Sequence, residues 1–190
     1  MLSHDHPSKE GPARGGVAGS GEPRVAALGA ALALFLSTFV NKVDRKGRVS
    51  VPATFRAALA GQAFNGIVAY RSFKLPSIEA SGIDRMEEMS ARIDALDEFS
   101  EDRDALSSIF ADAQQLAFDG EGRVVLPEAL CQHAGISEGA AFVGLGRTFQ
   151  IWEPQRFDRH QQELRERARR QGTTLPARRP ERPPPERGAP

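Results

Sequence analysis

One motif occurs twice in this chain and constrains its fold more than any other feature. The stretches VDRKGRVSVP at 43–52 and FDGEGRVVLP at 118–127 carry Asp, Gly, Arg, an apolar residue and Pro at equivalent places. A constant offset of 75 residues aligns Asp44 with Asp119 and Pro52 with Pro127. Because the same offset also aligns apolar pairs some twenty residues further on, the chain is predicted to contain a duplicated folding unit.

Each copy of the motif predicts a β-turn. Asp44 and Gly47 in the first copy, like Asp119 and Gly122 in the second, occupy the first and fourth positions of a four-residue turn. Asp at the first position can accept nearby backbone N–H groups, and Gly tolerates the geometry with which the chain leaves the turn. These four residues are therefore assigned a structural role.

A strand is expected on each side of the turn. The segment 39–43 is predicted to enter it, and 48–51 to leave it, as the two strands of a hairpin. Alternation of polar and apolar residues after the turn places Val49 and Val51 inward and Arg48 outward. Pro52 and Pro127 then end the strands and suit the first turn of a short helix.

The remaining elements follow from periodicity and from chain breakers. The connector between the copies has apolar residues every three or four positions, which predicts one amphipathic helix over 83–113 that contacts the core; these residues are Ile83, Met86, Met89, Ile93, Leu96 and Phe99. A matching helix is expected to start near Phe157. The other expected elements are helices over 52–61 and 127–135 and strands over 66–70, 75–79, 141–145 and 149–152.

These elements divide the chain into five parts. They are an extension at 1–34, a first repeat at 35–82, a helical connector at 83–112, a second repeat at 113–156, and a helix with an Arg/Pro-rich tail at 157–190. The extension is expected to be disordered or translated from a mis-assigned start. Its apolar run at 25–36 has 12 residues, fewer than the roughly 18 that span a bilayer. Export through a signal peptide is the alternative.

The tail at 165–190 combines arginines with prolines and cannot build a core. It is expected to be a solvated helix end followed by a disordered segment. The alternative is a basic arm that attracts phosphates irrespective of sequence.

Charge separates the two copies of the motif, although the whole chain has a formal net charge of zero. Over 41–58, five cations oppose the single anion Asp44, whereas over 116–133 three anions oppose Arg123. A cationic surface suits nucleic-acid phosphates. The first copy is therefore the candidate nucleic-acid binder; its five cations are Lys42, Arg45, Lys46, Arg48 and Arg56.

The segments FVNKVDRKGRVSVPATFRAAL and FDGEGRVVLPEALCQHAGI resemble the SpoVT/AbrB-like fold, and two tandem copies over about 35–165 resemble the MraZ family. The resemblance implies an α+β fold of duplicated, swapped-hairpin β units with short helices and pseudo-two-fold symmetry, assembled into a ring-shaped homo-oligomer. It also implies a bacterial transcriptional regulator. Such a regulator binds short direct repeats upstream of the division and cell-wall gene cluster, including its own gene, and is cytoplasmic and associated with the nucleoid.

The candidate DNA contacts lie on the first hairpin. Arg45 and Lys46 are expected at its tip, and Lys42 and Arg48 on its outward strand faces. A two-stranded ribbon fits the major groove, where Arg can bind guanine through two hydrogen bonds and Lys can hold phosphates. Asp44 is expected to brace the turn and to orient Arg48. In the second copy, Arg123 is expected to form an ion pair with Asp119 or to lie in a subunit contact.

Two other classes of function compete with this hypothesis. An enzyme is disfavoured because the sequence has no recognisable catalytic or nucleotide-binding motif, and because Cys131 and His133, two apart on a predicted helix, diverge. No metal, cofactor, small-molecule substrate or membrane is expected, and the single cysteine fits a reducing compartment. The alternative to a regulator is an AbrB-like antitoxin or other protein-interaction module. Such antitoxins typically carry one hairpin per chain.

Overall fold

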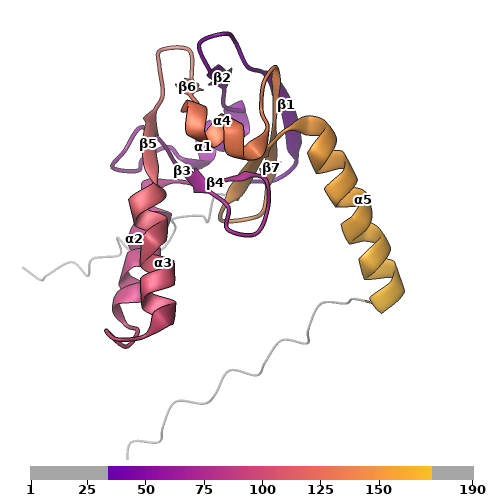
Figure 1. Cartoon of the computed structure of the whole chain (residues 1–190). Coiled ribbons are helices and arrows are strands. Elements are labelled where there is room, and N and C mark those ends of the chain that lie inside the picture. The colour runs from indigo at the N-terminus through magenta and orange to yellow at the C-terminus, as the bar shows by residue number, and fades with distance from the viewer. Residues whose placement is uncertain (1–33, 173–190) are drawn as a thin grey trace, which may run out of the picture. The chain divides into compact units, whose positions relative to one another are not determined.

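The computed structural model describes residues 34–172. The predicted extension, apart from Leu34, and the end of the Arg/Pro-rich tail lie outside the described residues. Within the described range, the chain forms β1 (Thr38–Lys42), β2 (Arg48–Ser50), α1 (Ala53–Ala58), β3 (Gly66–Arg71), β4 (Ile78–Ser81), α2 (Ile83–Asp94), α3 (Glu101–Asp112), β5 (Gln114–Ala117), β6 (Arg123–Val125), α4 (Glu128–Ala134), β7 (Gly139–Gly144), β8 (Phe149–Trp152) and α5 (Pro154–Gln171). The fold is therefore a mixed α+β fold (Figure 1).

The strands form two antiparallel sheets. The larger has six strands in the order β1-β7-β8-β4-β3-β5, and the smaller is a ribbon of β2 and β6. The strands of the two halves are therefore interleaved: β7 and β8 lie between β1 and β4, and β5 lies outside β3. Among residues 34–172, no helix is long and apolar enough to cross a membrane.

The predicted hairpin of 39–43 with 48–51 is wrong in its strand pairing, although a turn joins the two strands. The two segments pair as strands only at an isolated bridge between Val43 and Val49, and the side chain of Asn41 donates to the carbonyl of Ser50 at 2.7 Å. Beyond that bridge, β1 pairs with β7, where Phe39 lies opposite Phe142, and β2 pairs with β6. Alternation along a strand determines which side chains are buried, but it does not select the partner strand.

One face of the six-stranded sheet holds the main core. Ile78 of β4, Ile151 and Phe149 of β8 and Phe142 of β7 pack there against α1, α4 and the ribbon. Phe55 of α1 is fully buried. Its ring lies 5.1 Å from those of Phe35 and Phe149, 5.6 Å from that of Phe39 and 6.5 Å from that of Phe142, measured between centroids. Phe55 is thus the centre of the aromatic core.

The opposite face of the sheet carries two separate helical elements. The α2–α3 pair packs on β3, where Val68, Met86 and Ile109 form a buried cluster. Helix α5 packs near β7 and β8, where Phe157 lies 6.1 Å from Trp152 between ring centroids. The last turns of α5 extend away from the sheet (Figure 1).

The single helix predicted over 83–113 is wrong, because the connector is two helices. Helix α2 ends at Asp94, and α3 begins at Glu101 after Ser100, whose hydroxyl accepts the backbone N–H of Arg103 at 3.2 Å. Asp97 accepts the N–H of Phe99 at 2.8 Å. Such local side-chain acceptors compete with the helical pattern and favour a turn. As a result Phe99, predicted to contact the core, is exposed.

The other predicted elements agree with the structure except at their ends. Strand β4 begins at Ile78, three residues later than expected, because Pro76 has no N–H to donate and Ser77 donates to the carbonyl of Leu75 at 2.8 Å. Helix α5 begins at Pro154, before the expected Phe157. The carboxylate of Glu153 caps it by accepting the first free backbone N–H groups.

Candidate nucleic-acid interface

The first turn is closed by a dense set of hydrogen bonds around Asp44. The N–H of Gly47 donates to the carbonyl of Asp44 at 2.9 Å, which is the closing bond of a β-turn. Oδ1 of Asp44 accepts the backbone N–H groups of Lys46 at 2.8 Å and of Arg48 at 2.9 Å. Oδ2 accepts Nε of Arg48 at 2.7 Å. Asp44 therefore fixes both the turn and the base of the Arg48 guanidinium.

The second turn repeats this geometry. Gly122 donates to the carbonyl of Asp119 at 2.9 Å, and Oδ1 of Asp119 accepts the N–H groups of Glu121 and Arg123, both at 2.9 Å. Nε of Arg123 donates to Oδ2 of Asp119 at 2.8 Å. The two motifs thus have the same backbone and the same Asp-Arg contact.

Glycine is required at the fourth position of both turns. Gly47 has φ +75° and Gly122 has φ +72°, in the left-handed region that favours glycine. A Cβ atom on Gly47 would lie 2.9 Å from the carbonyl oxygen of Leu126. The turns are therefore packed against their surroundings as well as internally closed.

The two arginines differ in what contacts the end of the guanidinium. One terminal nitrogen of Arg123 forms an ion pair with the carboxylate of Glu121 at 2.7 Å. In the first turn, the residue equivalent to Glu121 is Lys46. Within the described part of the chain, Arg48 therefore forms an ion pair with Asp44 and with no other carboxylate. The end of the Arg48 guanidinium is therefore available to an external acceptor, whereas that of Arg123 is neutralised. The sequence shows this difference as Glu121 aligned with Lys46, but the prediction from sequence did not use it to distinguish the two arginines.

The four predicted DNA-binding residues lie at or beside the first turn. Arg45 and Lys46 are exposed in the turn, Lys42 is exposed at the end of β1, and Arg48 is half-buried at the start of β2. A shallow depression beside the turn continues to the start of α4, where Glu128 supplies a carboxylate. Most of the charge at this end of the ribbon is thus positive.

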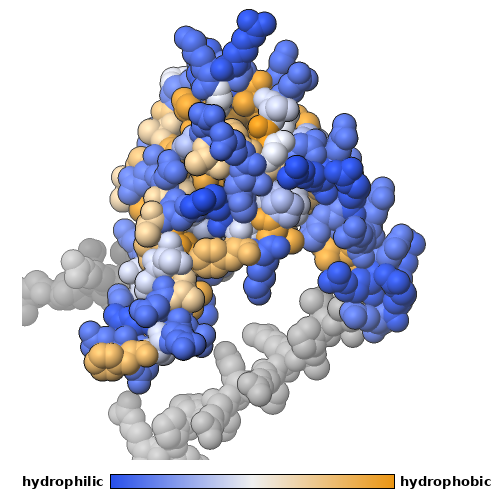
Figure 2. Space-filling model, in the orientation of Figure 1, coloured by the Kyte–Doolittle hydropathy of each residue, from blue (hydrophilic) through white to orange (hydrophobic). Residues whose placement is uncertain are grey.

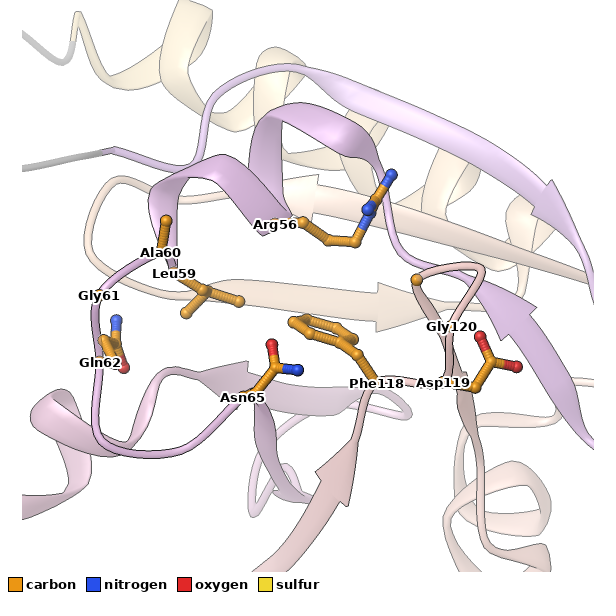
Figure 3. Close-up of a pocket in the computed structure, with 10 residues that line it drawn as sticks. Arg56, Leu59, Ala60, Gly61, Gln62, Asn65, Phe118, Asp119 and Gly120 are labelled. Atoms are coloured by element: carbon orange, nitrogen blue, oxygen red, sulfur yellow. The ribbon is translucent and has the colours of Figure 1, made fainter.

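Arg56, counted from the sequence with the basic first copy, lies instead against the second turn. Its guanidinium packs over Gly122 and its Nε donates to the carbonyl of Val51 at 3.2 Å. Arg56, Phe118 and Asp119 line a hollow of about 380 Å³. Figure 3 shows these side chains around it. Because β2 and β6 are antiparallel, the two turns lie at opposite ends of the ribbon. The positive charge of Arg56 therefore does not add to the first turn.

Hydrogen bonding lowers the pKa of both turn aspartates. The pKa of Asp119 is lowered to about 2. The largest cause is the hydrogen bond from the backbone N–H of Arg123, and the hydrogen bond from the Arg123 side chain is the second. The pKa of Asp44 is lowered for the same reason, with the backbone N–H of Arg48 as the largest cause. Both carboxylates are consequently ionised throughout the physiological pH range.

A carbon-detected NMR titration is expected to give a midpoint of about 2 for the Asp119 carboxyl, against 3.8 for an unperturbed aspartate. Because its pKa is lower in the folded state, ionised Asp119 stabilises the fold at pH above 3.8, and this contribution is lost as the pH falls toward 2. In Arg123→Ala the midpoint should rise but stay below 3.8, since the backbone donors remain. A wild-type midpoint at the unperturbed value would contradict the hydrogen-bond pattern.

Comparisons with known proteins identify a family for this chain. A sequence model described as "MraZ protein, putative antitoxin-like" matches residues 109–177. A protein of Rickettsia akari (strain Hartford), named "Transcriptional regulator MraZ", is 50% identical over 143 residues, which cover 75% of this chain and 96% of the relative. The chain belongs to the MraZ family. A relative of the same name from Rickettsia bellii (strain OSU 85-389) is 55% identical over 126 residues, covering 65% of this chain and 84% of the relative.

Membership of the MraZ family confirms the resemblance inferred from the two motifs. The curated relatives from Rickettsia akari and Rickettsia canadensis (strain McKiel) are both named as transcriptional regulators. The family is one of transcriptional regulators and not of enzymes, as the sequence predicted.

Proposed function

We propose that this chain is a DNA-binding transcriptional regulator that binds short direct repeats upstream of its own gene, within the division and cell-wall gene cluster. It acts in the cytoplasm, associated with the nucleoid. Membership of the MraZ family and the printed names of its relatives support the role in transcription. The protein contacts DNA through the first turn, with Lys42, Arg45, Lys46 and Arg48.

The observation that carries this proposal is the contrast between Arg48 and Arg123. Both side chains are held by the aspartate of their own turn at 2.7–2.8 Å. Only Arg123 is also held by a second carboxylate, at 2.7 Å. A guanidinium that is oriented but not neutralised is pre-organised to bind an acceptor on a base edge. The first turn is therefore suited to binding DNA, and the second turn has a structural role.

The residues around Arg48 have separate roles. Arg45 and Arg48 bind base edges, since a bidentate contact to guanine discriminates by about 1–3 kcal/mol. Lys42 and Lys46 hold phosphates and set register and salt dependence. Asp44 does not contact DNA; it fixes the turn through the bonds to Lys46 and Arg48.

The two motifs belong to tandem SpoVT/AbrB-like units at 35–82 and 113–156, joined by the connector 83–112. The matching turns and the exchange of strands between the halves support this assignment. In the proposal, β2 and β6 are the swapped ribbon strands of a pseudo-two-fold pair. The units of several copies assemble as a ring-shaped homo-oligomer.

A ring explains how one small turn per chain can bind tightly. A single turn buries far less than the roughly 1,000 Å² or more usual in specific DNA complexes. Several turns acting on several DNA repeats gain affinity through effective concentration. We expect a fragment of the upstream DNA with all its repeats to bind at least about 10²-fold more tightly than a fragment with one repeat.

This expectation is checked by band-shift titration at two salt concentrations. The matched control is a fragment of equal length and composition with scrambled repeats, which should bind weakly and lose most of its binding at the higher salt. Equal affinity for one repeat and for several would contradict the multivalent proposal. Equal affinity for repeats and scrambled DNA would contradict sequence-specific regulation altogether.

A toxin-binding protein is the second candidate, and the printed description of the family model as antitoxin-like favours it. The exposed first turn argues against it, since a protein partner does not need four cations at one end of a ribbon. Stoichiometric co-purification of a small nuclease with this chain, together with no binding to the upstream DNA, would favour the second candidate.

A further inference from the structure

The tip of the α2–α3 pair carries apolar side chains that nothing in the described structure covers. Phe99, in the connection between the helices, is 92% exposed. Leu96, in the same connection, is 37% exposed. Leu106 and Phe110, 38% and 36% exposed, lie on one face of α3 and continue from the tip toward the sheet. Figure 2 shows a hydrophobic patch at the far end of this pair, bordered by hydrophilic residues. A contiguous apolar patch bordered by polar residues is typical of an interaction surface.

The charge around this patch is acidic. The connector 83–112 contains ten Asp or Glu residues against three Arg. Ion pairs engage Glu88, Asp94 and Asp112. Within residues 34–172, five other carboxylates close to Phe99 in sequence form no ion pair; they are Asp97, Glu98, Glu101, Asp102 and Asp104. A partner for the patch therefore needs positive charge next to an apolar side chain.

Helix α5 of the same chain has that combination. It contains six Arg against three acidic residues, and none of these arginines forms an ion pair with any other described residue. Phe157 anchors its first turn, but every residue from Gln162 to Gly172 is exposed. Leu164, 45% exposed, and Ala168 continue the Phe157 face of the helix, and Arg165 and Arg167 flank them.

The exposed half of α5, from Gln162 onward, gains stability when it packs against another surface. An isolated helix of this length is marginal in water, so an exposed apolar stripe favours a tertiary or quaternary contact. The two elements share one face of the sheet but are anchored on different strands, α2–α3 on β3 and α5 on β7, with β4 and β8 between them. Two distinct, complementary surfaces on one chain produce head-to-tail contacts between copies, and such contacts form a ring when the rotation from one copy to the next closes on itself.

We propose that the second half of α5 of one copy docks on the tip of the α2–α3 pair of the next copy. Phe99 packs against Leu164 and Ala168, and the flanking arginines face the carboxylates of the tip and the Phe99 ring. This inference rests on the proposed ring and names the surfaces that form it. It also explains how a chain with no net charge carries two strongly charged helical elements.

Charge reversal tests the contact directly. One variant carries Glu98→Arg and Glu101→Arg at the tip, a second carries Arg165→Glu and Arg167→Glu in α5, and a third combines all four changes. Light scattering after size-exclusion chromatography, over a series of concentrations, gives the midpoint of assembly. We expect each two-residue variant to need about tenfold or more higher concentration to assemble, because like charges then face each other. The combined variant should return to within about threefold of the wild type, because opposite charges again meet.

A second pair of variants tests the apolar part. Phe99→Ser should weaken assembly about tenfold, whereas Phe73→Ser, also at an exposed phenylalanine, should leave it unchanged. The inference is overturned if the charge reversals do not weaken assembly, if the combined variant stays dissociated, or if Phe99→Ser behaves like Phe73→Ser.

The same samples separate this inference from the proposed function. Binding to a DNA fragment with a single repeat reports on the first turn alone, and it should be equal in the wild type and all five variants. A wild type that assembles while the reversals have no effect overturns only the docking surfaces. A wild type that stays monomeric with and without DNA overturns the ring itself. A wild type that does not bind the DNA fragment with a single repeat overturns the proposed function.

Discussion

Arg48→Ala is expected to lower affinity for the upstream DNA by about 10²-fold or more. The side chain supplies a bidentate contact worth about 1–3 kcal/mol in each subunit. Several subunits bind one DNA molecule, so the losses accumulate. A band-shift titration of the wild type and the variant on the same fragment measures the effect. Stability should fall only slightly, because the lost contact is a partly exposed ion pair.

Arg123→Ala is the matched control for this experiment. It removes the equivalent guanidinium from the second turn, together with its contacts to Asp119 at 2.8 Å and Glu121 at 2.7 Å. Its DNA affinity should stay within about threefold of the wild type, because that guanidinium is already neutralised. If Arg123→Ala lost binding and Arg48→Ala retained it, the assignment of DNA binding to the first turn would be reversed.

The second large effect is expected at Phe55. Phe55→Ala should lower the free energy of unfolding by about 3–5 kcal/mol, because it leaves a cavity at the centre of the core. Phe55 is 0% exposed, and its ring contacts those of Phe35, Phe39 and Phe149 at centroid distances of 5.1–5.6 Å. Such a loss is a large fraction of the stability of a typical domain. Urea denaturation followed by circular dichroism measures it.

Phe73→Ala provides the comparison within one residue type. Phe73 is 63% exposed, so its truncation should change the free energy of unfolding by no more than about 0.5 kcal/mol. Similar losses for the two variants would show that the aromatic cluster does not centre on α1.

The candidate site could be predicted from sequence where it depends on neighbours along the chain. The turn at Asp44–Gly47 and the inward direction of Val49 follow from residue type and spacing alone. The Asp44–Arg48 contact spans four residues and forms inside one turn. The contact between Glu121 and Arg123 is equally local, and comparison with Lys46 at the aligned position would have indicated it.

Other parts of the site depend on segments that are distant in sequence. Arg56 follows the first motif within a few residues, yet it lies over Gly122 at the far end of the ribbon. Its position follows from the antiparallel pairing of β2 with β6, which no local pattern specifies. Counting charges along the chain therefore overestimated the cations available at the first turn.

The sequence by itself determined the duplicated motif, the turns, the buried alternation in β2 and β6, and membership of the MraZ family, because each is a property of short stretches. Only the tertiary structure decided that β1 pairs with β7 and β2 with β6, and that Phe99 points away from the core. The physical reason is that strand pairing and helix breaks depend on which distant backbone groups and apolar faces satisfy one another. The period of apolar residues determines which face of a strand is buried, but it does not determine which other strand pairs with it.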